Sequence, residues 1–272
     1  MYKEYYELSE YPFNMTADPD FFFSSLHHEE AFAHLIYGIR QRKGILVVTG
    51  EIGTGKTTLC RTLLSRLDKN IKTALVLNPS FSEIQLLKLI VKDLGIPGNH
   101  RNKLDLVDAL NQFLLAETIL GNNVVLIIDE AQNLSVKQLE QIRLLSNLET
   151  EKEKLLQIIL VGQPELCDKL KLNTLRQLNQ RVSVRYHIQP LERSELSAYI
   201  NHRLKVANTS RNPNNHLHFT DEAIEIIYKN SFGTPRMVNI LCDRALLAGF
   251  SSETNKIDEN IVHQCIEEVV YK

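Results

Sequence analysis

The sequence predicts an α/β fold in which a parallel five-stranded sheet lies between helices, followed by a smaller part made only of helices. Strand patterns alternate with helical patterns up to residue 190. After Leu191 the strand patterns stop, and helical patterns alone follow to residue 272. We therefore expect two domains: an α/β domain over residues 1–190, which includes an aromatic N-terminal segment, and a helical domain over residues 191–272.

The expected strands can be placed one by one. Four are largely apolar, as is typical of parallel strands buried on both faces, and the fifth is a short segment just before the helical part. In chain order they cover residues 45–49, 73–77, 124–128, 156–163 and 186–188. Between them, the pairs Ser82/Gln85 and Ser135/Gln138 have capping-box spacing and predict two helix starts.

Composition excludes several classes of protein. The 272 residues are 43% hydrophobic and 24% charged, which is ordinary for a globular chain. A net charge of −2 gives no global attraction to nucleic acid or anionic membranes, although a local basic patch stays possible. The four cysteines form no CxxC pair, which favours buried thiols in a reducing compartment. The sequence shows neither a membrane-span pattern nor a signal-peptide core, so we expect a cytoplasmic protein.

A glycine-rich loop is the first sign of chemistry. Residues 50–57 match the phosphate-loop pattern GxxxxGK[ST] at every fixed position, between an expected strand and a helical pattern. Glycines allow backbone N–H groups to converge on a phosphate at the helix start, Lys56 would neutralise the β- and γ-phosphates, and Thr57 would hold Mg²⁺. The alternative is a glycine-bearing turn with a surface lysine. We predict a nucleotide site formed by Gly50, Glu51, Ile52, Gly53, Thr54, Gly55, Lys56, Thr57 and Thr58.

Two carboxylates, Asp129 and Glu130, follow the third expected strand directly. In a nucleoside triphosphatase, the first would hold the Mg²⁺ shell and the second would orient and deprotonate the attacking water. Neighbours on a regular strand point to opposite faces, so both can serve one site only if the chain bends at the strand's end. A solvated acidic turn is the alternative, and the phosphate loop makes it the weaker one.

A glutamine, Gln163, is the polar terminus of the fourth expected strand and would arrive near the γ-phosphate and the attacking water. It could sense that phosphate through a hydrogen bond. A simple turn at Gly162, Gln163 and Pro164 explains the same residues equally well.

Arginines occur at two further places. Arg176, Arg181 and Arg185 lead into the fifth expected strand, where a solvated basic face is the usual interpretation. An arginine just before the last strand can instead project into a neighbouring subunit's nucleotide site. Arg236 falls in the first turn of a helix that begins with Thr234 as cap and Pro235 at the first helical position, so it could reach phosphate. A surface arginine is again the alternative.

The ordered motifs resemble a known family. GEIGTGKTT, LIIDEAQNL, LSNLET, LLQIILVGQPEL, LRQLNQRVSVRYHIQPL and GTPRMVNILCDRALL are similar to the ATPase region of the secretion-pathway A protein family (ExeA/GspA type), part of the AAA+ superfamily. The opening YYELSEYPFNMTADPDFFF also resembles the start of that family, so the resemblance covers nearly the whole chain. It implies an AAA+ αβα sandwich with a helical lid domain, ATP and Mg²⁺ as ligands, and a ring or other oligomer.

The resemblance also implies roles for individual residues. Lys56 and Thr57 would contact phosphate and Mg²⁺, and Asp129 and Glu130 would form the Walker B pair. Gln163 would be the first sensor, where Asn or Thr is more usual, and Arg236 the second sensor. An arginine finger is implied among Arg176 and Arg181, and we prefer Arg181 because it directly precedes the strand.

Three functions fit these expectations. The first is an ATPase that assembles or energises an envelope machine of the type II secretion, pilus or exopolysaccharide kind. The second is a DNA-associated regulator of the transposition type, which the near-neutral charge weakens, and the third is a slow nucleotide-switched scaffold. Larger members of the family carry a membrane span and a periplasmic part that this sequence does not show. We therefore expect either part of a longer chain or a protein that works with a separate inner-membrane partner.

Overall fold

The computed structural model describes residues 1–208 and 217–270. The chain divides into two compact units. One comprises residues 28–51 and 59–188, and we call it the sheet unit. The other comprises residues 1–27, 52–58 and 189–272, and we call it the helical unit.

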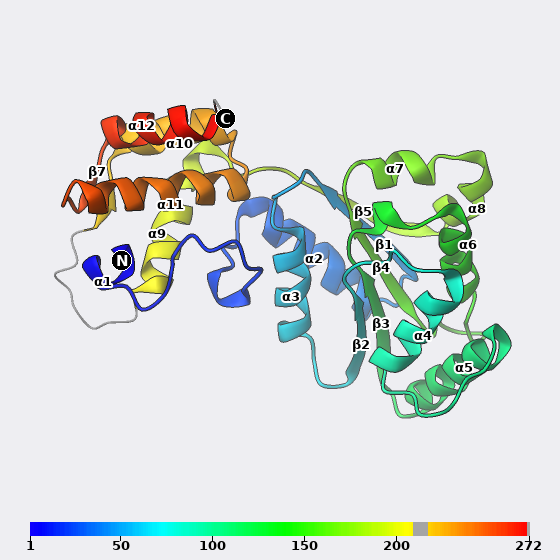
Figure 1. Cartoon of the computed structure of the whole chain (residues 1–272). Helices are drawn as coiled ribbons and strands as arrows, with labels where there is room; N and C mark the ends of the chain where they lie inside the picture. Colours follow the sequence, from blue (N-terminus) through cyan, green and yellow to red (C-terminus); the bar gives the residue numbers. More distant parts are fainter. Residues whose placement is uncertain (209–216, 271–272) are drawn as a thin grey trace. The chain divides into compact units, whose positions relative to one another are not determined.

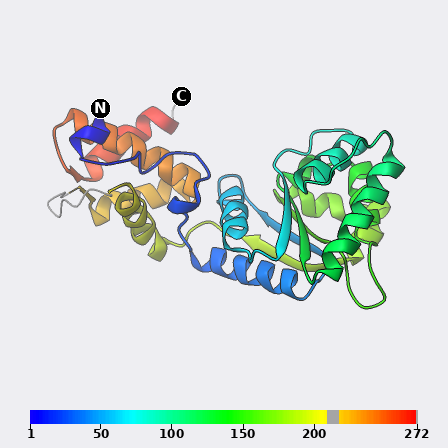
Figure 2. The same cartoon turned by 90° about the horizontal axis from the view of Figure 1, so that it is seen from below.

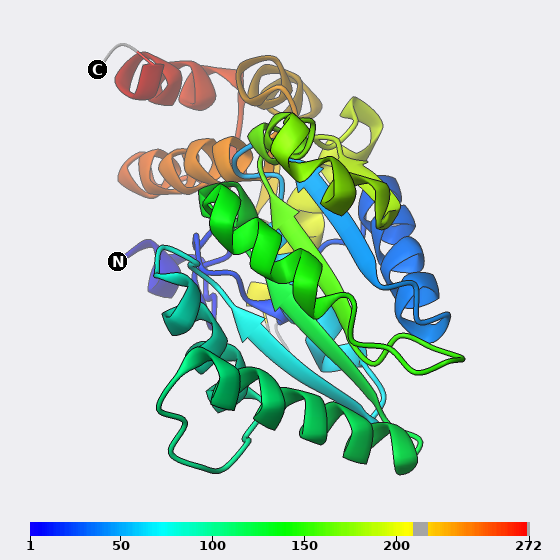
Figure 3. The ribbon, with the colours of Figure 1, turned by 90° about the vertical axis from the view of Figure 1, so that its right-hand side faces the viewer.

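The sheet unit contains five parallel strands in the order β2-β3-β4-β1-β5 (Figures 1 and 3). This confirms the predicted sheet. The strands are β1 Ile45–Gly50, β2 Ile71–Val76, β3 Asn123–Ile128, β4 Gln157–Gly162 and β5 Val182–Ile188. All residues of β1, β3 and β4 are buried, which explains why these strands appear in the sequence as continuous apolar runs.

Strand β5 begins four residues earlier than predicted, at Val182. It is an edge strand, and its residues alternate between partly covered and exposed. The exposed positions are Ser183, Arg185 and His187, so the sequence lacks the apolar run that marks the central strands.

Helices cover both faces of the sheet (Figures 1 and 2). On one face lie α2 Leu26–Arg40 and α3 Lys56–Arg66, and on the other lie α4 Glu83–Asp93, α5 Lys103–Ile119 and α6 Val136–Leu145. Both predicted capping boxes are present, at the starts of α4 and α6. After β4 the chain forms α7 Glu165–Leu170 and α8 Arg176–Gln180. One large apolar core joins the sheet to α4, α5 and α6.

The helical unit is built from α9 Arg193–Ala207, α10 Asp221–Ser231, α11 Pro235–Ser251 and α12 Glu259–Val270. A short parallel pair, β6 His218–Phe219 and β7 Lys256–Ile257, accompanies them. This confirms a helical C-terminal part, but the expectation of helices alone is wrong, because each of these two strands has only two residues and is too short to give a strand pattern in the sequence. No helix within the described residues is long and apolar enough to cross a membrane.

The aromatic N-terminal segment shares the core of these helices. Tyr2, Tyr6, Phe13 and Phe21 pack in one apolar cluster with residues of α9–α12, and α1 Tyr2–Tyr5 lies against α11 (Figure 2). The Tyr6 hydroxyl donates to the carbonyl of Leu246 at 3.1 Å. The sequence analysis assigned this segment to the α/β domain. Aromatic residues indicate that a segment is buried, but they do not indicate which domain buries it. The predicted boundary at residue 190, as a limit between independent domains, stays a prediction.

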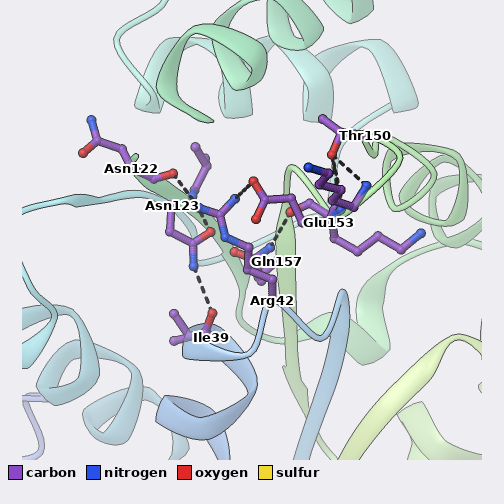
Figure 4. A network of polar contacts seen from close by, with 10 residues as sticks. Ile39, Arg42, Asn122, Asn123, Thr150, Glu153 and Gln157 are labelled. Atoms are coloured by element: carbon purple, nitrogen blue, oxygen red, sulfur yellow. Dashed lines mark hydrogen bonds and ion pairs between the residues drawn. The ribbon is translucent and has the colours of Figure 1, made fainter. Parts of the chain in front are cut away.

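A polar network joins the loops at the amino ends of the strands (Figure 4). Arg42, which has a left-handed φ of +48°, donates through Nη2 to the carbonyl of Asn122 at 3.0 Å. Its Nη1 atom lies 3.1 Å from a carboxylate oxygen of Glu153. The buried Asn123 side chain donates to the carbonyl of Ile39 at 2.9 Å. These contacts fix the turns before β1, β3 and β4 to one another.

Candidate active site

The predicted phosphate loop leaves β1 at Gly50 and enters α3 at Lys56. Gly53 and Gly55 both have a left-handed backbone, with φ of +83° and +90°. Thr54 is fully buried and Lys56 is 7% exposed. Left-handed glycines that lead into a helix start turn backbone N–H groups toward one point, where an anion is stabilised. The loop therefore has the geometry of a phosphate cradle.

This loop contacts the first turn of α11 within the helical unit. The backbone N–H of Arg236 donates to the carbonyl of Gly53 at 3.2 Å. A Cβ at position 53 would lie 2.5 Å from Arg236 Cβ and 3.3 Å from Thr234 Cγ2, so only glycine fits there. Helix α11 begins at Pro235 with Thr234 as N-cap, as predicted. Arg236 itself is exposed, and its guanidinium role stays a prediction.

The two predicted carboxylates lie in the sheet unit at the end of β3. Asp129 is 2% exposed, and its Oδ1 accepts from the backbone N–H of Glu130 at 2.9 Å. Glu130 is half-buried and has a left-handed φ of +51°, which is rare for a residue with a side chain. This conformation supplies the bend that two adjacent carboxylates need in order to serve one site. A short 3₁₀ turn, Ala131–Asn133, follows at once.

A glutamine that the sequence interpretation missed connects Glu130 to the end of β4. Gln132 Nε2 donates to Glu130 Oε2, and Gln132 Oε1 accepts from the backbone N–H of Gln163 at 3.0 Å. A Cβ at Gly162 would lie 2.7 Å from Gln132 Oε1, so glycine makes room for the amide. The signal in the sequence was an amide two residues beyond the second carboxylate, in the motif DEAQ.

The predicted finger arginines, Arg176 and Arg181, lie in α8 and directly before β5. Arg181 directly precedes β5, whose first residue, Val182, pairs with Ile45 at the amino end of β1. The phosphate loop leaves β1 at Gly50, which pairs with Ile188. The intervening strand is about 17 Å long, at about 3.3 Å per residue. The structure therefore does not bring Arg181 to the strand end from which its own phosphate loop begins.

The neighbours of these arginines support the same placement. Lys154 lowers the pKa of the Glu149 carboxyl, and the more distant Arg181 charge contributes to the same shift. Glu149 pairs with Lys154 across the turn before β4, at the amino ends of the strands. Arg176 starts α8, and both Arg176 and Arg181 are exposed.

Comparison with known proteins agrees with this geometry. The sequence model of one family, described as an AAA domain, matches residues 39–170. The general secretion pathway protein A of Aeromonas hydrophila is 42% identical over 258 residues, which are 94% of this chain and 46% of the relative. The chain thus spans about half the length of the curated relative it matches.

Solved structures with low sequence identity share the fold. The Aeropyrum pernix ORC2 protein has a TM-score of 0.68 at 16% identity, over 96% of this chain and 71% of that one. Drosophila ORC bound to DNA has a TM-score of 0.72 at 17% identity, over 99% and 66%. The Thermotoga maritima RuvB branch migration motor has a TM-score of 0.57 at 20% identity, over 91% and 72%. These structures show the fold alone, whereas the 42% identity with general secretion pathway protein A over 94% of the chain, with the AAA domain match, shows that the chain belongs to the secretion-pathway A protein family of AAA-type ATPases.

Proposed function

We propose that this chain binds ATP with Mg²⁺, hydrolyses it as an oligomer, and thereby drives the assembly or operation of a cell-envelope machine. The observation that carries the ATPase proposal is the end of β3, where the buried Asp129 is followed by Glu130 in a left-handed backbone conformation. The envelope role, of the type II secretion, pilus or exopolysaccharide kind, rests on the 42% identity with general secretion pathway protein A. It implies an inner-membrane partner and a cytoplasmic location at that membrane.

The phosphate loop holds the nucleotide. Lys56 neutralises the β- and γ-phosphates, and the left-handed backbones of Gly53 and Gly55 turn N–H groups toward a phosphate. The Thr57 hydroxyl and the Asp129 carboxylate are hard oxygen donors of the kind that Mg²⁺ prefers. When bound, Mg²⁺ neutralises charge that develops on the phosphate oxygens.

The remaining groups activate the attacking water or sense the γ-phosphate. Glu130 orients the attacking water and accepts its proton. Gln163 hydrogen-bonds the γ-phosphate as first sensor. Arg236, whose main chain bonds to Gly53, reports the γ-phosphate to α11 as second sensor.

An oligomer completes the site. Arg181 lies at the opposite end of β1 from its own phosphate loop, so it can serve only the loop of another chain. Such a finger raises turnover by about 10³- to 10⁵-fold in related nucleoside triphosphatases. Arg176 is the alternative finger.

ATP turnover measured against protein concentration, with and without DNA, tests the proposal. We expect specific activity to rise with concentration and DNA to leave it unchanged, and we expect Lys56→Ala to lose tight ATP binding. Arg181→Ala should bind ATP but lose the rise. Mixing Arg181→Ala with Lys56→Ala should restore turnover once cross-linking shows that the two variants share one assembly.

Three results would redirect the proposal. Concentration-independent turnover by a monomer contradicts the assembly, and an unimpaired Arg181→Ala moves the finger to Arg176. Stimulation by DNA favours a DNA-associated regulator of the transposition type. Tight ATP binding without turnover at any concentration favours a nucleotide-switched scaffold.

A further inference from the structure

We propose that Gln132 is a positioning residue that holds Glu130 against the end of β4. The proposal rests on the function proposed above, because it concerns the group that activates water. One side-chain amide makes both contacts: its Nε2 donates to Glu130 Oε2 and its Oε1 accepts from Gln163 N. Gln132 therefore links the expected catalytic base to the main chain of the expected first sensor.

The orientation of this amide follows from its partners. The backbone N–H of Gln163 can only donate, so the atom that faces it must be the amide oxygen. The NH₂ group is then forced toward Glu130, whose carboxylate can only accept when ionised. Neither contact survives a flip of the amide. A glutamine thus satisfies both neighbours, and a glutamate at the same position could satisfy only Gln163.

The surroundings hold Gln132 in place from two further sides. Lys169 on α7 donates through Nζ to the carbonyls of Gln132 and Leu134, which fixes the 3₁₀ turn after Glu130. Gly162 leaves the space that the amide occupies, since a Cβ there would lie 2.7 Å from Gln132 Oε1 and 3.2 Å from Gln132 N. A side chain fixed at its main chain and at both ends of its amide can set the direction of a carboxylate.

This positioning controls the rate of the chemical step. Glu130 occupies a left-handed backbone conformation, and its side chain is half-buried. Misplacement of a reacting group by about 1 Å can cost about 100-fold in rate. The amide of Gln132 aims the carboxylate and leaves nucleotide binding to the phosphate loop. Its loss should therefore lower kcat and leave KM for ATP unchanged.

Two substitutions separate positioning from structural support. Gln132→Glu keeps the acceptor for Gln163 N but places a second carboxylate against Glu130. Gln132→Met keeps the length of the side chain and removes both contacts. We expect each variant to retain ATP binding and to lose about 10- to 100-fold in kcat. Gln85→Glu is the matched control, because its carboxylate still accepts from Ser82 N in the capping box of α4. It should keep wild-type kcat.

A double-mutant cycle with Glu130→Gln supplies a readout that structural support would not change. If Gln132 acts through Glu130, adding Gln132→Glu to Glu130→Gln should lower kcat no further. An additive loss, or wild-type kcat in Gln132→Glu, overturns the positioning role even if Gln132→Met fails to fold. Wild-type kcat in Glu130→Gln overturns the proposed base itself, and no turnover in the wild type overturns both.

Discussion

The two ends of the five-stranded sheet both carry side-chain amides, and they use them differently. At the amino ends, Asn123 is buried and donates to a main-chain carbonyl, that of Ile39. At the carboxyl ends, Gln132 is half-buried and donates to a side-chain carboxylate, that of Glu130. An amide that binds buried main chain stabilises the fold, whereas an amide that binds a half-buried carboxylate sets the direction of a reactive group.

The carboxylates at the two ends are held by different groups. Glu153 at the amino ends is paired with Arg42, whose guanidinium also bonds to the main chain of Asn122 (Figure 4). Glu130 at the carboxyl ends takes a left-handed backbone conformation that costs about 1–2 kcal/mol for a residue with a side chain. Arg42 at the amino ends also has a left-handed backbone, with φ of +48°, so strain does not distinguish the two ends. They differ in the group that holds the carboxylate: a guanidinium contacts Glu153, and a neutral amide contacts Glu130.

The largest expected effect tests this difference with one substitution made at both ends. Glu130→Gln should lower ATP turnover by about 10²- to 10⁴-fold, because it removes the general base, and ATP should stay bound. Glu153→Gln, the matched control, should keep wild-type turnover and lose less than about 1 kcal/mol in the free energy of unfolding. Steady-state turnover, ATP binding and urea unfolding measure the two variants. Similar turnover in both would remove the distinction between the two ends.

A glycine-to-alanine pair sharpens the comparison. Gly53 follows the carboxyl end of β1, and Gly121 precedes the amino end of β3; both have left-handed backbones, with φ of +83° and +76°. Gly53→Ala would also bring its Cβ to 2.5 Å from Arg236 Cβ, whereas a Cβ at Gly121 has no described atom within 4 Å apart from its own residue and its two chain neighbours. We expect Gly53→Ala to weaken ATP binding about 10-fold or more.

Gly121→Ala supplies the control for backbone strain alone. It should lower the free energy of unfolding by about 1–2 kcal/mol and leave the Kd for ATP unchanged. Equal Kd values for ATP in the two variants would show that the close approach to Arg236 has no bearing on the nucleotide site.

The smallest expected effect on ATP turnover concerns Asn123. Asn123→Ala removes one of two donors to the carbonyl of Ile39, which still accepts from the backbone N–H of Arg42 at 3.1 Å, so it should cost about 0.5–1.5 kcal/mol in the free energy of unfolding. The kcat per folded molecule should not change. Urea unfolding measures the first quantity, and turnover normalised to the folded fraction measures the second. A loss of kcat with unaltered stability would assign the amino ends a part in the chemistry.

The sequence predicted the elements whose signal is local. β1, β3 and β4 are buried throughout, so their apolar runs and the polar residues after them could be read directly, including Lys56, Asp129 and Glu130. Most of β5 was missed because an edge strand alternates. Gln132 was missed because its contact with Gln163 depends on the left-handed backbone of Glu130. Glutamate rarely adopts that conformation, so the sequence does not predict it there.

The aromatic N-terminal segment has a consequence for the order in which the protein forms during translation. Tyr6 precedes its partner Leu246 by 240 residues, so at about 5–20 residues per second it leaves the ribosome about 10 to 50 s earlier. All residues of the sheet unit, 28–51 and 59–188, are synthesised in that interval. The sheet can therefore form on the nascent chain while Tyr2, Tyr6, Phe13 and Phe21 still lack the helices that bury them. For that interval these side chains lack the apolar core that covers them in the folded protein.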